Sequence, residues 1–130
     1  MEITHPAIAH QDDRGRILDV LEGIDINYVT VISSKKGVSR GSHYHKKTTQ
    51  WVYILRGKML AHSRMPDGPL KRAVLEEGDL IKNVPLEHHA LTALEDTEFL
   101  VLTAGLRGGK DYEKDTYRLP KPMQDELQNE

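Results

Sequence analysis

The 130-residue chain contains no cysteine. Disulfides, thiolate metal ligands and cysteine nucleophiles are therefore all excluded, and any reactive or metal-binding site has to be built from nitrogen and oxygen donors. No apolar stretch approaches the length of a membrane span, and the first residues lack a basic segment followed by an apolar run. We therefore expect no membrane partner and a cytoplasmic location.

The chain also lacks a block of basic residues. Its 18 Lys and Arg residues are spread along the sequence, and the formal net charge is −2 with histidine neutral. Nucleic-acid-binding domains concentrate positive charge on one surface, so nucleic acid is not an expected partner. A chain of 130 residues has the size of one domain, and such a domain buries roughly two-thirds of the surface that its unfolded form exposes.

Short segments rich in β-branched and aromatic residues, separated by turn residues, make up most of the sequence. Segments 28–33 (YVTVIS), 51–55 (WVYIL) and 98–103 (EFLVLT) are typical of strands. Segment 65–69 (MPDGP) is typical of a turn. The sequence therefore predicts an all-β domain, with any helix confined to the last 25 residues.

The dipeptide Arg56-Gly57 separates two strand-like segments and fits the loop of a two-residue β-hairpin. In the register that this hairpin imposes, one face would carry Gln50, Val52, Ile54, Met59, Ala61 and Ser63. His62 would point to the opposite face, which removes it from the candidate ligands. The small side chains of Ala61 and Ser63 would leave room for a cavity.

The opposite face of the expected hairpin is too apolar to be left in water. It would carry Trp51, Tyr53, Leu55, Leu60 and His62. Either the N-terminal arm or a second subunit should cover it. We expect a homodimer, because closed two-fold pairs are the most common oligomers.

Histidines are arranged so that several can meet on one wall. His43 and His45 are two residues apart, so both imidazoles project from the same face of an extended strand. The polar link 46–49 can bend, which brings Gln50 back beside them. His89 offers a third imidazole from a later strand, while the adjacent His88 has to point away.

The spacing of these residues resembles the two-part signature of the cupin superfamily. Gly37-x5-His43-x-His45-x4-Gln50-x6-Gly57 is similar to the first part, and Gly78-x10-His89 to the second. The resemblance implies a single-domain double-stranded β-helix, a jelly-roll barrel over residues 12–105, with an N-terminal arm (1–11) and an irregular or partly helical tail (106–130). It also implies a divalent metal ion (Zn, Ni, Fe or Mn) held by His43, His45, Gln50 and His89. The family usually has Glu at the position of Gln50, so metal affinity should be lower here.

A closer resemblance lies within these motifs. Segments 13–15 (DRG) and 37–44 (GVSRGSHY) are similar to a pattern of the dTDP-4-dehydrorhamnose 3,5-epimerases, and 43–46 (HYHK) resembles the sugar 3,4-ketoisomerases. This implies a small-molecule substrate, a nucleotide-linked keto sugar of polysaccharide biosynthesis. His43 or His45 would be the base that removes a proton next to the ketone. The epimerases use a Lys to stabilise the enolate, which segment 51–55 lacks, so Arg40 or a metal ion would replace it.

Several alternatives stay open at this point. A metal ion bound by both His43 and His45 would leave neither as a base. The barrel could also bind a sugar without catalysis, or act as a metal-dependent lyase or oxygenase on a small acid, although the set lacks the carboxylate of the 2-His-1-carboxylate site. Arg14 fits either a turn or a phosphate anchor, and we favour the turn. His5 and His10 are expected on the surface, and the C-terminal tail is expected to dock loosely.

Overall fold

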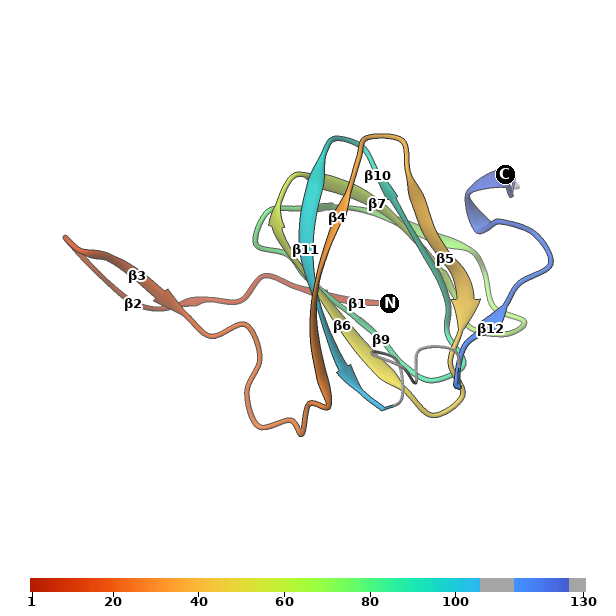
Figure 1. Ribbon diagram of the computed structural model, residues 1–130, viewed down its shortest axis with the longest axis horizontal. Helices are drawn as coiled ribbons and strands as arrows, with labels where there is room; N and C mark the ends of the chain where they lie inside the picture. Colours follow the sequence, from red (N-terminus) through yellow and green to blue (C-terminus); the bar gives the residue numbers. More distant parts are fainter. Residues whose placement is uncertain (106–113, 127–130) are drawn as a thin grey trace.

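In a computed structural model that describes residues 1–105 and 114–126, the chain folds into two five-stranded antiparallel sheets that enclose one core (Figure 1). The first sheet has the order β1 (Glu2–Thr4), β9 (Leu80–Asn83), β6 (Thr49–Arg56), β11 (Thr97–Ala104), β4 (Tyr28–Ser34). The second has the order β12 (Tyr117–Arg118), β5 (Ser39–Tyr44), β10 (His88–Ala93), β7 (Lys58–Arg64), β8 (Lys71–Glu76). The expected all-β jelly-roll fold is confirmed.

The core lies between the two sheets and follows the two-residue period of each strand. Every second residue of β6, β7 and β11 points inward. The buried cluster consists of Val52, Ile54, Met59, Ala61, Leu75, Ile81, Ala93, Phe99 and Val101. Ile54 is fully buried, and a side chain of this size stabilises the fold by about 2 kcal/mol when it leaves water.

The two-residue hairpin expected at Arg56-Gly57 is wrong. β6 pairs with β9 and β11, whereas β7 pairs with β8 and β10, so the chain crosses from one sheet to the other at this dipeptide. Gly57 has a φ of 96°, and a Cβ there would lie 2.6 Å from the carbonyl oxygen of Asp96. Only glycine fits this barrel corner, because it combines a left-handed conformation with close backbone approach.

The inward-facing residues expected from that hairpin still face the core, but from opposite sheets. Gln50 on β6 and Ser63 on β7 are both buried, although they are not cross-strand partners. His62 points to the outer face of the second sheet, where burial and the positive charge of Arg72 lower its pKa.

The apolar outer face around Trp51 and Tyr53 is covered by the chain itself. Leu18 at the end of β3 packs on it, together with Val20, Leu21 and Ile26 from the connection between β3 and β4. A second subunit is therefore not what buries Trp51 and Tyr53. Leu60, expected on the same face, belongs to the other sheet.

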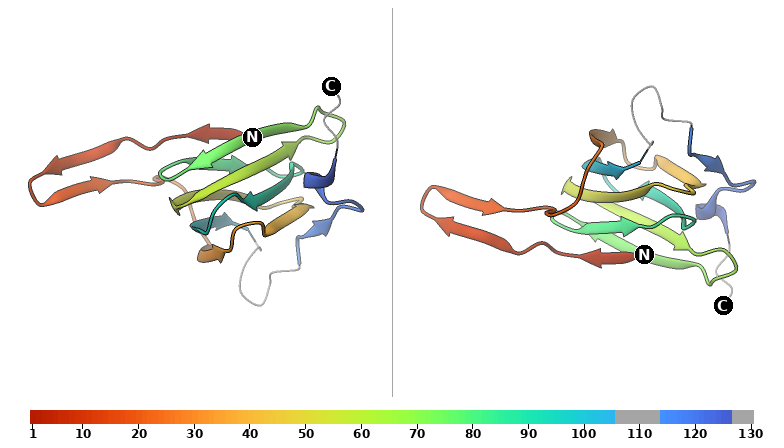
Figure 2. Two further views of the ribbon diagram at one scale, coloured as in Figure 1. Left: turned by 90° about the horizontal axis from the view of Figure 1, so that it is seen from above. Right: turned by 90° about the horizontal axis from the view of Figure 1, so that it is seen from below.

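The N-terminal region has two parts. β1 pairs with β9 and so belongs to the first sheet. β2 (Ile8–Asp12) and β3 (Gly15–Leu18) form a separate hairpin that projects away from the barrel (Figure 2). The expected start of the barrel at residue 12 falls inside this hairpin, directly before the turn that contains Arg14.

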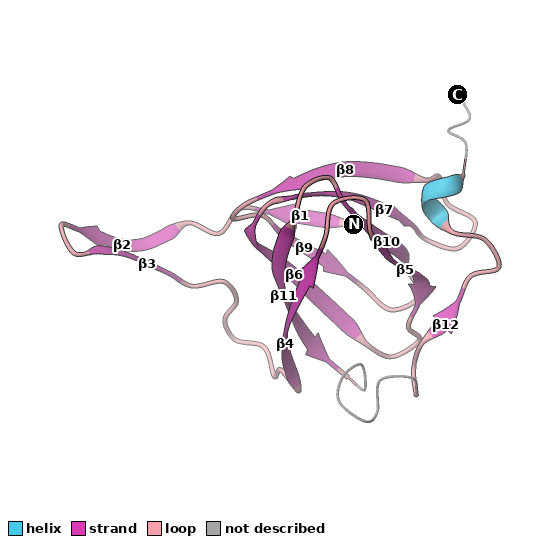
Figure 3. Ribbon diagram, turned by 45° about the horizontal axis from the view of Figure 1, so that its top comes forward, coloured by secondary structure: helices cyan, strands magenta, loops and turns pink. Residues whose placement is uncertain are grey.

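The described part of the C-terminal tail docks tightly, contrary to expectation. β12 pairs with β5, and Met123, in the short 3-10 helix Met123–Asp125, is fully buried (Figure 3). This is the one helical element among the described residues, so the expectation of little helix holds for them; the rest of the tail, 106–113 and 127–130, lies outside the described residues. Within the described ranges, no helix is long and apolar enough to cross a membrane.

Candidate functional site

Three imidazoles meet inside one end of the barrel. His43 on β5 is the cross-strand partner of His89 on β10, and His45 follows directly after β5. The ring centroids lie 4.7 to 5.2 Å apart, and one ring nitrogen of each histidine lies within 4.8 Å of the others. All three side chains are buried. The structure thus brings together the three histidines that the sequence spacing singled out.

Gly41 makes this close approach possible. It has a φ of 99°, and a Cβ at this position would lie 2.8 Å from the carbonyl oxygen of His89. The pairing of β5 and β10 shifts register between His89 and Ala90, next to the same contact. A glycine at this point lets the two strands close around the bulge, which aims His43 and His89 at each other.

The tautomers of two histidines follow from their partners. His45 Nδ1 lies 2.7 Å from the backbone oxygen of Asp115, and His89 Nδ1 lies 3.0 Å from the backbone oxygen of Glu87. A carbonyl oxygen only accepts hydrogen bonds, so both Nδ1 atoms carry the proton. In a neutral ring, Nε2 then holds the lone pair that can take a proton or bind a metal ion.

Gln50 contacts His45 from the other side. Its Oε1 lies 3.2 Å from His45 Nε2. With Nδ1–H already donated to Asp115, this contact is satisfied either by a doubly protonated His45 or by a Gln50 amide turned to donate its N–H. In both arrangements His45 is fixed on both sides of its ring, so its orientation is set before any ligand binds.

Asp115 is a site residue that sequence reasoning missed, as is Asn83 in the cavity wall. Its carboxylate accepts hydrogen bonds from the backbone N–H groups of Lys46 and Lys47 and from the Thr48 hydroxyl, at 2.8 to 3.0 Å. Burial raises the pKa of this carboxyl, but the hydrogen bonds from Thr48 and the two amides, with His45 nearby, lower it overall. Asp115 thus holds both the loop after His45 and, through its carbonyl, the His45 ring. Asp115 lies in a charged stretch of the tail, and no sequence pattern distinguishes it from the other charged residues there.

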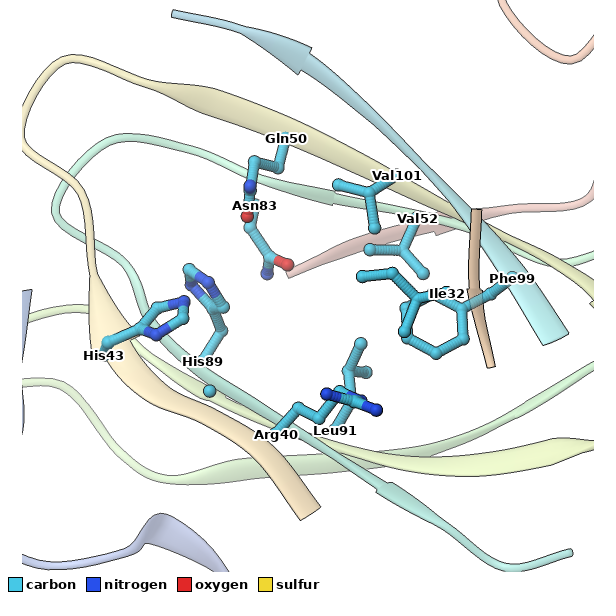
Figure 4. A pocket seen from close by; sticks show the side chains of 11 residues that line it. Ile32, Arg40, His43, Gln50, Val52, Asn83, His89, Leu91, Phe99 and Val101 are labelled. Atoms are coloured by element: carbon cyan, nitrogen blue, oxygen red, sulfur yellow. The ribbon is translucent and has the colours of Figure 1, made fainter. Parts of the chain in front are cut away.

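A cavity opens beside the histidines (Figure 4). The space within it, counted together with open solvent at its mouth, is about 570 Å3. The polar part of its wall consists of Arg40, His43, Gln50, Asn83 and His89. The apolar part consists of Ile32, Val52, Leu91, Phe99 and Val101. His45 does not line it, so a ligand in this cavity would meet His43 and His89 first.

Arg40 brings a positive charge to the cavity wall. Its Nε donates to Ser34 Oγ at 2.7 Å, and its Nη2 donates to the backbone oxygen of Ser33 at 3.0 Å. The side chain is therefore held by the end of β4 while its remaining N–H groups can meet an anion.

The other histidines lie away from the cavity. His88 stacks on Tyr44 on the outer face of the second sheet, with ring centroids 5.0 Å apart. His5 and His10 are exposed and lie beside Asp79 and Asp12. Arg14 pairs with Asp12 inside the hairpin turn.

The sequence matches the family model described as polysaccharide biosynthesis C-terminal domain over residues 10–117. The chain belongs to this family. No curated protein sequence matches the chain significantly. Among solved structures, this family member is similar to the sugar 3,4-ketoisomerase QdtA from Thermoanaerobacterium thermosaccharolyticum in complex with TDP, with 24% identity, a TM-score of 0.75, and 92% of this chain and 88% of that chain covered.

Two further structures resemble this member of the polysaccharide biosynthesis family. A 3,4-ketoisomerase from Helicobacter canadensis has 18% identity and a TM-score of 0.76, covering 90% of this chain and 89% of that chain. A dTDP-4-dehydrorhamnose 3,5-epimerase from Sulfolobus tokodaii has 22% identity and a TM-score of 0.69, covering 79% and 69%. The predicted resemblance to cupins of this kind is confirmed, and the similar structures are sugar isomerases and epimerases.

Replacing Asp115 by Asn should lower the free energy of unfolding by about 2 kcal/mol at pH 7, because the buried Thr48 hydroxyl and two part-buried backbone N–H groups lose a charged acceptor. The folded pKa is lowered, so this stabilisation is complete above the unfolded pKa of about 3.9 and disappears as the pH falls through the folded pKa. Urea unfolding of both proteins from pH 7 to pH 3 measures it. Asp125→Asn, which changes an exposed carboxylate of the same tail, is the control; equal effects of the two substitutions would contradict the role of Asp115.

Proposed function

We propose that the protein is an isomerase that moves a proton next to the ketone of a nucleotide-linked keto sugar, producing ketone migration or epimerisation. The observation that carries this proposal is the pair His43 and His89, which line one cavity together. The Nδ1–H of His89 is donated to Glu87, so its Nε2 is the basic nitrogen. An imidazole with a pKa near ~6.5 can take and return a proton near neutral pH.

The similar structures support this substrate class. QdtA is a sugar 3,4-ketoisomerase, and one of its histidine-to-asparagine mutants is described in complex with TDP-4-keto-6-deoxyglucose. The polysaccharide biosynthesis family of this chain agrees with a sugar substrate. The cavity, polar on the side of the histidines and apolar on the other, suits a sugar with both hydroxyl and apolar groups.

The reaction needs one base, one proton donor and a partner for negative charge. An imidazole removes the proton from the carbon next to the ketone, the C–H electron pair forms a C=C bond, and the ketone oxygen becomes an enolate. Return of the proton to the same carbon from the other face gives the epimer. For ketone migration, the enolate oxygen takes up a proton, the neighbouring hydroxyl loses one as it becomes the new ketone, and the former carbonyl carbon is protonated. Arg40 would meet the negative charge of the nucleotide diphosphate or of the enolate.

Incubation with a panel of dTDP- and UDP-linked 4-keto sugars in deuterated water tests the proposal. Epimerisation leaves deuterium at carbon 3 or carbon 5, and ketone migration leaves it at carbon 4, the former carbonyl carbon; mass spectrometry and NMR detect both. His43→Asn and His89→Asn should each lower the exchange rate by at least about 100-fold, since each removes a base or acid. His88→Asn, on the outer face, is the matched control and should exchange like the wild type. If the wild-type protein bound these sugars without deuterium exchange, the proposal would be wrong and the protein would be a non-catalytic sugar-binding protein.

A divalent metal ion at the three histidines is a second candidate, favoured by their geometry. Nitrogens of His43, His45 and His89 lie within 4.8 Å of one another. Two of these rings donate Nδ1–H to a backbone carbonyl, as metal-bound histidines do. Gln50 would add an oxygen, and the ion (Zn, Ni, Fe or Mn) would polarise the ketone when bound. Such an ion would occupy the lone pairs that the base requires, so the two roles compete.

Metal analysis after growth in supplemented medium separates the two roles. If the histidines bind a metal ion, His43→Ala, His45→Ala and His89→Ala should each reduce metal content several-fold. His62→Ala and His88→Ala, whose rings lie on the outer face, should keep it. Gln50→Glu adds a negative ligand and should raise affinity. Equal metal content in all variants, or none in the wild type, would leave the histidines as bases.

We also propose that the protein is a homodimer, with a different surface at the interface from the one expected from sequence. The projecting hairpin exposes Ile8 and Ile17, and the edge strand β4 exposes Val29 and Val31, with 45% to 64% of each side chain accessible. A two-stranded hairpin alone is marginally stable in water, and edge strands are normally covered.

Light scattering should therefore give about twice the chain mass of 14.8 kDa. Ile17→Asp and Val31→Asp should shift the protein toward monomer, while Val74→Asp, an equally exposed site on the second sheet, should not. A monomeric wild type at micromolar concentration would contradict the dimer.

A further inference from the structure

We infer that Asn83 is a catalytic residue whose side-chain N–H stabilises the enolate oxygen formed in the cavity. The inference rests on the proposed function, because the enolate is the intermediate of that reaction. In the epimerases a Lys stabilises the enolate. The sequence led us to expect Arg40 or a metal ion in this role, and we now assign it to the neutral amide of Asn83.

The Asn83 amide is buried without the partner that a buried amide needs. The side chain is 4% exposed, and its Nδ2 has no hydrogen-bond partner among the residues that the structure describes. Burying an amide donor without a partner destabilises a fold, so buried polar groups are nearly always hydrogen-bonded. A donor kept in this state at the wall of a cavity is suited to an acceptor that arrives with a ligand.

Asn83 is placed beside a second amide in the same condition. It is the cross-strand partner of Gln50, on neighbouring strands β9 and β6 of the first sheet. In the orientation that places Oε1 beside His45, Gln50 Nε2 likewise has no partner within the described residues. Figure 4 shows the Asn83 amide pointing into the cavity toward the space next to His43 and His89. The donors therefore lie on one sheet and the bases on the other, with the cavity between them.

This separation is what proton abstraction next to a ketone requires. As an imidazole takes the proton from carbon, the electron pair moves onto the ketone oxygen, which becomes an anion. A donor already oriented toward that oxygen stabilises it without reorganisation, and in a buried site the gain is larger than in water. A hydrogen bond to Asn83 strengthens as the charge develops, so it lowers the barrier more than it improves substrate binding.

Arg40 is less suited to this task. Two of its donor groups are already used by Ser34 and Ser33, and its side chain is exposed. A charge at the edge of a cavity is better placed for a diphosphate than for an enolate inside it.

Three variants test the inference by two independent measurements. Asn83→Leu replaces the amide by an apolar group of similar shape, Asn83→Asp keeps the shape but removes the donor, and Thr103→Val is the matched control. Thr103 Oγ1 is also buried without a partner in the described part of the chain, in the same cross-strand row, but Thr103 does not line the cavity. The measurements are the melting temperature without ligand and the kinetics of deuterium exchange with the keto sugar that the wild type uses.

Asn83→Leu should lower kcat for exchange by about 100-fold or more with KM nearly unchanged. It should also raise the melting temperature by about 3 °C, because an unsatisfied buried donor is removed. Asn83→Asp should lose exchange to the same extent or more. Thr103→Val should be stabilised as well but exchange like the wild type.

Each other outcome decides against one of the two proposals. Exchange near the wild-type rate in Asn83→Leu or Asn83→Asp overturns the enolate role while leaving the proposed function intact. A lower melting temperature for Asn83→Leu shows that the amide serves the fold, through an ordered water molecule for example, and also overturns it. A wild type that exchanges no deuterium with any keto sugar overturns the proposed function, and the enolate role with it.

Discussion

The pairing of β5 with β10 is the contact on which the rest of the site depends. It sets His43 opposite His89 and, through the register shift beside Gly41, brings both imidazoles to the same end of the barrel. Without this pairing, His43 and His89 would lie on strands that are not neighbours. The fold can maintain this contact because β10 is held on its other side by β7, so the position of His89 is determined by two ladders of hydrogen bonds.

The site combines groups of two kinds, those that are satisfied within the fold and those that are not. His45 belongs to the first kind, held by Asp115 and Gln50. Asn83 belongs to the second, because its Nδ2 has no partner among the residues that the structure describes. A barrel core built only for stability would bury apolar groups at these positions. The buried polar groups at this end of the barrel therefore lower the stability of the fold. The apolar cluster around Ile54 and Phe99 compensates for this loss.

Sequence patterns predicted the strands and the three histidines because both depend on local periodicity and on spacing. They failed at Arg56-Gly57, where a glycine between two strands is compatible with a hairpin and with a barrel corner. The partner of each strand is set by contacts distant in sequence, which a local pattern does not contain. Asn83 was missed because its chemistry depends on the absence of a partner, and Asp115 because its partners are about 70 residues away.

The distance of 70 residues in sequence between His45 and Asp115 has a consequence for folding during synthesis. The carbonyl that sets the His45 tautomer follows it by 70 residues, after every strand of the barrel except β12. During synthesis the sheets can form around β5, β6, β10 and β11 before residue 115 has left the ribosome. The three histidines can then lie together, but His45 still lacks the carbonyl oxygen that orients its ring. A nascent chain can therefore form both sheets except for β12 before the Asp115 carbonyl is available to hold the His45 ring.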